Sequence, residues 1–140
     1  MILGLGIDLV QVSRFVCWDR YNCSQLEKIF TIEEINYYKK LYQKNEKNIF
    51  LASRYAAKEA CYKAISSWYE KFFRSCFTRG FLLVAPKIMV SLPGNGVPEL
   101  QAQGFLLELF NHNKVLSTVS LSHEKEYVVA SVIIMSREGL

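Results

Sequence analysis

The sequence has no paired-cysteine motif, no long apolar run and no large excess of one charge, and each absence excludes a class of protein. Its four cysteines lack C-x-x-C spacing, which argues against a zinc ribbon or a thioredoxin-type redox pair. The apolar runs fall far short of the roughly 20 residues of a membrane-spanning helix. The first residues carry no positive charge, unlike a secretory signal. We therefore expect a cytoplasmic protein with free thiols and no membrane partner.

The composition is that of one folded domain. The chain has 140 residues, of which 51% are hydrophobic and 14% aromatic, so it has ample material for a packed core. Because it contains no internal repeat, low-complexity tract or linker, we predict a single domain over residues 1–140. The 17 Lys and Arg residues against 13 Asp and Glu residues give a net charge of +4, which favours an acidic partner without naming one.

Residues 2–10 alternate between two kinds of side chain, as a β-strand does. One face is apolar and is predicted to face the core: Leu3, Leu5, Ile7 and Leu9. The other face has no side chains until it reaches a carboxylate: Gly4, Gly6 and Asp8. A strand face without side chains lets another backbone or a ligand approach closely. Asp8 is therefore a candidate site residue, although a lone aspartate is more often solvated or caps a turn at a strand end.

The remaining pattern predicts an α+β domain in which an antiparallel sheet packs against helices. Thr31 and Glu34 have the spacing of a capping box, and a helix is expected to follow as far as about Tyr42. Further helices are expected over 24–30, 49–72 and 100–110. Strands are expected over 87–92, 115–121 and 127–135, with the last two joined as a hairpin. Polar turns are expected at 43–48 and 93–96.

The longest predicted helix carries the densest group of charged side chains. Glu59 and Lys63 lie one turn apart on one face, and a second pair, Arg54 and Lys58, has the same spacing on an adjoining face. The simplest interpretation is an exposed helix with charge pairs, each contributing about 0.3–0.5 kcal/mol. If Glu59 meets Asp8, however, the two carboxylates form an all-oxygen site suited to Mg²⁺ and substrate phosphates. Basic residues around such a site are what phosphoryl transfer needs.

His123 is one of two histidines and lies in the polar segment between the two hairpin strands. Ser120 and Ser122 give it polar neighbours, but the chain has no G-x-S-x-G nucleophile elbow, so a serine hydrolase is not indicated. A hairpin histidine with no catalytic role is the ordinary alternative. Gly4-x-Gly6 likewise lacks the third glycine of a dinucleotide-binding fingerprint.

Several short motifs, taken in order, resemble the holo-acyl-carrier-protein synthase family of 4'-phosphopantetheinyl transferases. They run nearly end to end: Gly6-Ile7-Asp8-Leu9 with Arg14-Phe15, Phe30-Thr31-x-x-Glu34, Arg54-Tyr55-Ala56-Ala57-Lys58-Glu59-Ala60 with Lys63-Ala64, Gly96-x-Pro98, and Ser120-Leu121-Ser122-His123. The resemblance implies a small α+β fold and a homotrimer with active sites between neighbouring subunits. It also implies transfer of phosphopantetheine from coenzyme A to a serine of apo-acyl carrier protein, in fatty acid biosynthesis, with release of adenosine 3',5'-bisphosphate.

The resemblance also implies roles for the motif residues. Asp8 and Glu59 would hold Mg²⁺ against the coenzyme A pyrophosphate. Glu59 would also act as the base for the acceptor hydroxyl, either directly or through a metal-bound water. Lys63 would stabilise the departing phosphate, and His123 would lie near the phosphates. The implied substrate-binding residues are Arg54, Lys58, Gly96, Pro98 and Ser122 for coenzyme A and Arg14 for the acidic carrier protein.

Two regions depart from the family pattern. Val97 stands where the family commonly has lysine, and residues 66–86 match poorly because aromatic and basic residues extend them. A different class of function also stays open, a basic module that binds RNA or an acidic protein without catalysis. Against it, the basic residues alternate with acidic ones and no RNP-type or helix-turn-helix signature is present, so no nucleic acid partner is expected. A homologue that binds coenzyme A but does not label the carrier protein is the third alternative.

Overall fold

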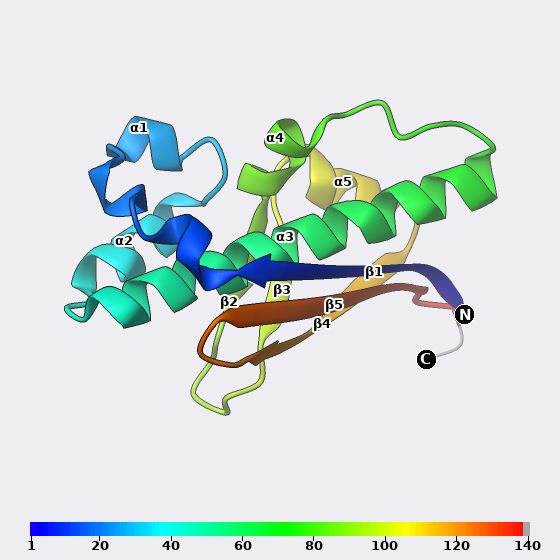
Figure 1. Cartoon of the computed structure of the whole chain (residues 1–140). Coiled ribbons are helices and arrows are strands. Elements are labelled where there is room, and N and C mark those ends of the chain that lie inside the picture. The colour runs from blue at the N-terminus through cyan, green and yellow to red at the C-terminus, as the bar shows by residue number, and fades with distance from the viewer. Residues whose placement is uncertain (139–140) are drawn as a thin grey trace.

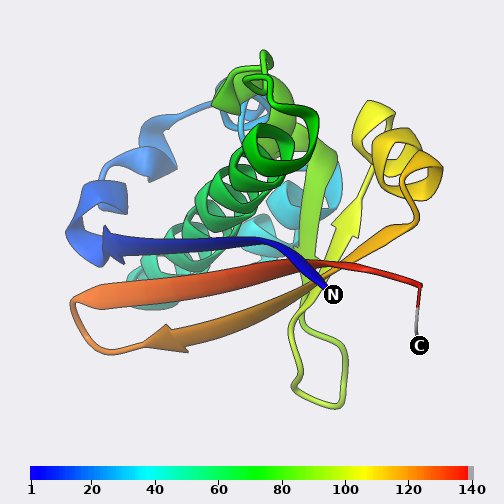
Figure 2. The same cartoon turned by 90° about the vertical axis from the view of Figure 1, so that its right-hand side faces the viewer.

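A long helix lying across a three-stranded antiparallel sheet forms the centre of the molecule, in a computed structural model that describes residues 1–138 (Figure 1). The sheet order is β1-β5-β4, with bounds Ile2–Gln11 for β1, Val115–His123 for β4 and Tyr127–Ser136 for β5. β4 and β5 form the predicted hairpin, and β1 pairs antiparallel with β5. Figure 2 shows the helices gathered on one side of this sheet. The predicted α+β class with an antiparallel sheet is confirmed.

The helix that covers the sheet is α3 (Lys44–Phe73). It begins earlier than predicted, so the polar residues 44–48 form its first turn instead of a loop. Small residues along its buried side let it approach the strands closely: Ala52, Ala56, Ala57, Ala60 and Ala64. It ends before Arg74, whose φ of 49° is the left-handed conformation that commonly follows a helix. None of the helices within residues 1–138 has the length and apolar character needed to cross a membrane.

The glycine face of β1 is the face that meets α3. A Cβ atom at Gly6 would lie 1.9 Å from the Ala60 carbonyl oxygen, and one at Gly4 would lie 2.2 Å from that of Ala64. The expected close approach of another backbone is therefore confirmed. The opposite face, predicted to be core, is buried only at its first residue, and three side chains are more than half exposed: Leu5 at 52%, Ile7 at 55% and Leu9 at 64%. That prediction was wrong because α3 packs on the glycines and leaves the leucine side of the strand uncovered.

The part of the chain that connects β1 to α3 forms a small group of short helices at one end of the molecule (Figure 1). Its elements are η1 (Val12–Phe15), η2 (Trp18–Arg20), α1 (Cys23–Leu26) and α2 (Ile32–Lys40). The predicted capping box starts α2: Thr31 N donates to the Glu34 carboxylate at 2.9 Å, and Glu34 N donates to the Thr31 hydroxyl at 3.3 Å. Because Leu41 is already extended, α2 stops slightly short of the predicted end.

A second, two-stranded sheet lies behind α3 in the view of Figure 1. The elements between α3 and β4 are α4 (Phe81–Val84), η3 (Ala85–Lys87), β2 (Ile88–Ser91), β3 (Glu99–Ala102) and α5 (Phe105–His112). The loop between β2 and β3 contains the predicted turn, in which Gly96 has a φ of 75° and its N–H donates to the Pro93 carbonyl oxygen at 2.9 Å. The helix predicted over 100–110 is wrong in its first residues, which belong to β3. Gly104, with a φ of 55°, separates that strand from α5.

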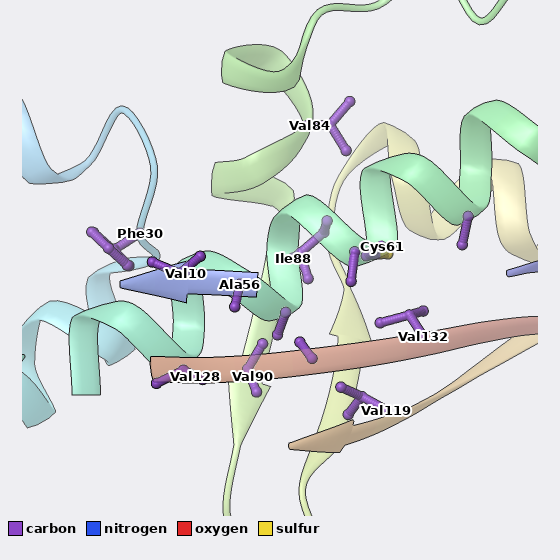
Figure 3. Close-up of a cluster of buried hydrophobic side chains, with 14 of the residues drawn as sticks. Val10, Phe30, Ala56, Cys61, Val84, Ile88, Val90, Val119, Val128 and Val132 are labelled. Atoms are coloured by element: carbon purple, nitrogen blue, oxygen red, sulfur yellow. The ribbon is translucent and has the colours of Figure 1, made fainter. Parts of the chain in front are cut away.

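The core extends from the inner face of the three-stranded sheet, across α3, to Val84 of α4 and Ile88 of β2 (Figure 3). It includes Val10 from β1, Ala56 and Cys61 from α3, Val119 from β4, and Val128 and Val132 from β5. The four cysteines are free thiols, as predicted, and only Cys61 is fully buried. Burial raises the pKa of the Cys61 thiol to about 12, so this thiol stays neutral and acts as a small apolar side chain.

Candidate active site

Asp8 and Lys63 form an ion pair where β1 lies against α3. The Lys63 ammonium donates to Asp8 Oδ1 at 2.8 Å and to the Ile7 carbonyl oxygen at 3.1 Å. The two residues meet because the glycines before Asp8 let the helix lie directly on the strand. The Asp8 side chain is 13% exposed and that of Lys63 is 48% exposed, so the ammonium remains accessible to a ligand from solvent.

Glu59 lies beside this ion pair, one turn before Lys63 on α3. Burial raises the pKa of Glu59 and the negative charge of Asp8 raises it further, while the positive charges of Lys63 and Arg14 lower it. The two carboxylates and the two cations therefore share one electrostatic environment. The structure thus brings together Asp8, Glu59 and Lys63, which lie on two elements far apart in the sequence.

The donor chemistry of this group fits a hard divalent cation. Asp8 and Glu59 offer carboxylate oxygens, and Mg²⁺ is commonly bound by one or two carboxylates together with waters and substrate phosphates. Residues 1–138 contain no cluster of three or more His, Cys, Asp or Glu side chains that could hold a metal, so the protein side of such a site would rest on these two groups. Lys63 would have to release the Asp8 oxygen, and a substrate phosphate offers its ammonium a new partner.

A second set of predicted site residues lines a cavity of about 530 Å³ between α3, the β2–β3 loop and the end of the β4–β5 hairpin. These residues are Arg54, Gly96, Pro98 and His123, and we call the space the Arg54–His123 cavity. Tyr37 and Phe50 give it an aromatic wall, with ring centroids 5.2 Å apart in a stacked arrangement. Aromatic rings beside cationic side chains suit a planar base that carries phosphates.

Arg54 is oriented in this cavity by its neighbours on α3. Its guanidinium carbon lies 4.3 Å from the Phe50 ring centroid, and its Nη1 donates to the Ser53 hydroxyl at 3.0 Å. Its Nε is buried and has no hydrogen-bond partner within residues 1–138. Burial lowers the pKa of Arg54 and the charge of Glu34 raises it, but a guanidinium stays protonated in proteins. The unpaired N–H is favourable only if a ligand supplies an acceptor.

Lys58 lies one turn after Arg54 on the same side of α3, but it is closed to ligands. Its side chain is fully buried and its ammonium lies 2.9 Å from the Glu34 carboxylate. The same ammonium donates to the carbonyl oxygens of Ala85, at 2.9 Å, and Ile88. Three acceptors use all three donors of a lysine. The structure therefore corrects the substrate-binding role implied for Lys58: because the side chain points toward η3 and β2, it holds these segments to α3.

Ser122 and Arg14 lie at the surface. Successive residues of β4 point to opposite faces, so Ser122 lies on the outer face while His123 lines the cavity. Ser122 and His123 thus lie on different faces of the sheet in the single chain. Arg14, in η1, places its guanidinium 5.2 Å from the Tyr55 ring centroid. Its positive charge also lowers the pKa of Glu59, so the exposed Arg14 side chain lies near the carboxylate pair.

Two residues that shape the site were not identified from the sequence. Glu34 was recognised only as the start of a helix, although its carboxylate also pairs with Lys58. Its place in the Phe-Thr-x-x-Glu motif was the available signal. Phe50 stacks on Arg54 and lines the cavity, and nothing in its sequence neighbourhood marks it.

The two groups of site residues stay separate within one chain. The lining of the Arg54–His123 cavity includes none of Asp8, Glu59 and Lys63. Both groups nevertheless use α3 and the inner face of the same sheet, so their relative position is fixed by the core. A ligand that touches both would have to reach from one surface of a chain to another, or from one subunit to the next.

Comparison with known proteins identifies the family of this chain. Residues 4–132 match the 4'-phosphopantetheinyl transferase superfamily. The chain belongs to this superfamily. A holo-[acyl-carrier-protein] synthase from Dechloromonas aromatica is 34% identical over 135 residues, which cover 96% of this chain and 98% of the relative. One from Nitrosococcus oceani is 36% identical over 142 residues, which cover 99% of this chain and 84% of the relative.

Solved structures give the same result for this transferase. The holo-(acyl-carrier-protein) synthase from Bacillus anthracis, in complex with CoA (3',5'-ADP), has a TM-score of 0.69 and 29% identity, covering 97% of this chain and 98% of that one. The synthase from Neisseria meningitidis has a TM-score of 0.76 at 24% identity, with 97% and 100% covered, and shows the shared fold. The enzyme is a holo-[acyl-carrier-protein] synthase by family, which favours catalysis over the RNA- or acidic-protein-binding alternative.

Proposed function

We propose that Asp8, Glu59 and Lys63 form the centre at which this enzyme transfers 4'-phosphopantetheine from coenzyme A to a serine of apo-acyl carrier protein. The reaction releases adenosine 3',5'-bisphosphate and serves fatty acid biosynthesis. The observation that carries the residue assignment is the Asp8–Lys63 ion pair at 2.8 Å, with Glu59 in the same electrostatic field. Two carboxylates and an accessible ammonium are the groups that a pyrophosphate substrate requires.

In this proposal Asp8 and Glu59 hold Mg²⁺. When bound, Mg²⁺ neutralises the charge that develops on the pyrophosphate oxygens. Glu59 is also proposed as the base that removes the serine proton, because its carboxylate lies in the same electrostatic environment as Asp8 and Lys63. The serine oxygen then bonds to the phosphorus that carries pantetheine, and the bond from that phosphorus to the bridging oxygen breaks. Lys63 stabilises the negative charge left on the departing phosphate.

The Arg54–His123 cavity is proposed to bind the nucleotide end of coenzyme A. The exposed Tyr37 ring, which stacks on Phe50, offers a face for the base, and Arg54 Nε offers an unused donor for a phosphate or base acceptor. Gly96, Pro98 and the His123 imidazole complete the lining of the cavity. Arg14 is proposed to contact the acidic carrier protein, because it is exposed beside the transfer centre and carries the right charge.

We also propose a homotrimer with active sites between subunits. The outer face of the sheet exposes a row of apolar side chains that the described part of the chain does not cover: Leu5, Ile7, Leu9 and Val129. Contiguous apolar surface of this kind marks a protein interface. Association of copies also offers a way for the transfer centre of one chain to meet the Arg54–His123 cavity of another, which a single chain leaves apart.

Intact-mass analysis of apo-acyl carrier protein tests the proposal. Incubation with the enzyme, coenzyme A and Mg²⁺ should add one phosphopantetheinyl group to the carrier protein, and EDTA should prevent the addition. An unchanged mass with a folded enzyme that still binds coenzyme A would identify a non-catalytic homologue. No coenzyme A binding, together with an affinity for RNA that falls steeply with salt, would support the binding module instead.

A further inference from the structure

A buried polar network joins three elements behind the Arg54–His123 cavity. The Glu34 carboxylate accepts from Lys58 at 2.9 Å, from the Thr31 backbone N–H at 2.9 Å and from the Val90 backbone N–H at 2.9 Å. Glu34 and Lys58 expose 2% and 0% of their side chains. Lys58 in turn donates to the carbonyl oxygens of Ala85 and Ile88. A single carboxylate therefore ties α2, α3 and β2 together.

Each element in this network carries part of the cavity wall. Arg54 lies one helical turn before Lys58 on α3, and β2 leads from Val90 directly into the loop that places Gly96 and Pro98. Tyr37, on α2, follows Glu34 by one turn and stacks on Phe50. Moving Glu34 would thus change the distance between Arg54 and the β2–β3 loop.

Glu34 also lines a cavity itself. A smaller cavity of about 330 Å³ lies beside the first one and is lined by Glu34, Arg54, Val90 and Leu92 among others. Arg54, Tyr37, Phe50 and Leu92 line both cavities. Two members of the network, Glu34 and Val90, therefore line the smaller cavity, and Arg54, whose buried Nε is unpaired, lines both cavities.

We infer that Glu34 is a positioning residue for coenzyme A: through Lys58 and Val90 it fixes Arg54 and the β2–β3 loop at the spacing that the nucleotide end requires. This inference rests on the proposed function of the cavity. Glu34 does not touch the transfer centre at Asp8, Glu59 and Lys63. Its loss should therefore weaken coenzyme A binding and leave the chemical step largely intact.

Because Glu34 forms an ion pair with Lys58, two variants can separate the effect of Glu34 on protein stability from its effect on the position of Arg54 and the β2–β3 loop. Glu34→Gln keeps the side-chain length and a capping group at the start of α2, but it leaves the buried Lys58 ammonium without its counter-charge. Glu34→Gln combined with Lys58→Met removes both charges, and replacing a buried ion pair in this way is often neutral for stability. The double variant still lacks the carboxylate that joins α2, α3 and β2.

The test measures thermal unfolding, kcat and KM for coenzyme A in the wild type and both variants, below the unfolding temperature of the least stable one. Glu108→Gln, which removes an exposed carboxylate on α5, is the matched control. We expect the double variant to recover stability relative to Glu34→Gln while KM for coenzyme A stays raised about tenfold, the equivalent of one charge-assisted hydrogen bond, with kcat within about twofold of wild type.

Direct titration with adenosine 3',5'-bisphosphate gives a readout that does not depend on turnover, and the same loss of affinity is expected there. If KM and the bisphosphate affinity return to wild-type values when stability recovers, Glu34 is only structural and the inference is overturned. A fall in kcat as large as the expected change in KM, with KM itself unchanged, would overturn the inference as well. If the double variant does not fold, the same comparison of KM with kcat in Glu34→Gln alone decides. A wild-type enzyme that neither transfers nor binds the bisphosphate would overturn the proposed function, and the inference with it.

Discussion

A methyl group on Gly6 would lie 1.9 Å from the carbonyl oxygen of Ala60, so strand β1 and helix α3 are in backbone contact at this point. Two residues further along the strand stands Asp8, and one residue before Ala60 on the helix stands Glu59. The absence of a side chain at Gly6 therefore lets the helix that carries Glu59 lie directly on the strand that carries Asp8. The glycine is as much a part of the site as the acids are.

Gly6→Ala should destabilise the enzyme and reduce transfer together. A methyl group at this position must push α3 away from β1, and overpacking of this kind costs about 1–3 kcal/mol. The displaced helix would carry Glu59 and Lys63 away from Asp8. Urea unfolding and the initial rate of transfer measure the two effects. Gly80→Ala, where an added methyl group meets open space, is the control and should leave both unchanged. A Gly6→Ala enzyme as stable and active as wild type would show that the contact is looser than described.

Glu59→Gln should make the metal-free protein more stable at neutral pH while abolishing transfer. The fold raises the pKa of Glu59 above its ordinary value of 4.5, so the folded state favours the protonated form and the ionised carboxylate opposes folding. This cost is fully present above the raised pKa and disappears as the pH falls below the ordinary value. The stability advantage of Glu59→Gln, followed by urea unfolding in EDTA, should therefore shrink with acidification. A variant less stable than wild type at neutral pH would contradict the assigned environment of Glu59.

Leu5→Glu should disrupt the proposed trimer and lower transfer without unfolding the chain. The side chain is 52% exposed on the outer face of the sheet, so a charge there is costly only if another subunit covers it. Light scattering reports the mass of the assembly, and circular dichroism reports the fold. Leu82→Glu, at a 59% exposed position on α4, is the matched control. A wild-type enzyme that is a stable monomer and still turns over would contradict a site shared between subunits.

Val97→Lys should lower KM for coenzyme A. The residue is 56% exposed between Gly96 and Pro98, which line the Arg54–His123 cavity, and a lysine there would add a positive charge near the proposed phosphate contacts. An exposed ion pair contributes up to about 1 kcal/mol, which corresponds to roughly fivefold in affinity at low salt. Steady-state kinetics at two salt concentrations would detect the change, which should diminish as salt rises. A higher KM, or one that does not respond to salt, would place the nucleotide elsewhere.

The sequence predicted most of the elements because their signals are local. Thr31 and Glu34 marked the start of α2, the apolar runs marked the hairpin of β4 and β5, and alanine-rich residues marked α3. It also indicated that a backbone would approach the glycines of β1. What it could not supply was the choice of face: alternation places leucines opposite glycines, but which side α3 covers is decided by packing between distant segments.

In the site, too, the sequence predicted the arrangement of residues within one element but not the contacts between distant elements. Spacing placed Glu59 and Lys63 on one helical face, and their meeting with Asp8 was expected only from a family resemblance. The substrate-binding role of Lys58 was implied by the family resemblance alone, and its charged neighbours indicated an exposed side chain, whereas the structure buries it against Glu34 from a preceding helix. Ser122 and His123 are adjacent in sequence, yet strand geometry sends them to opposite faces of the sheet.

The most direct test of the account is calorimetric titration of the enzyme with Mg²⁺ in the presence of coenzyme A, comparing wild type with Asp8→Asn and Glu59→Gln. Both variants keep the shape of the side chain and remove one ionised ligand. We expect saturable Mg²⁺ binding by the wild type, its loss in each variant, and loss of carrier-protein labelling in parallel, with circular dichroism unchanged. Mg²⁺ binding of wild-type strength in either folded variant would contradict a cation held between Asp8 and Glu59.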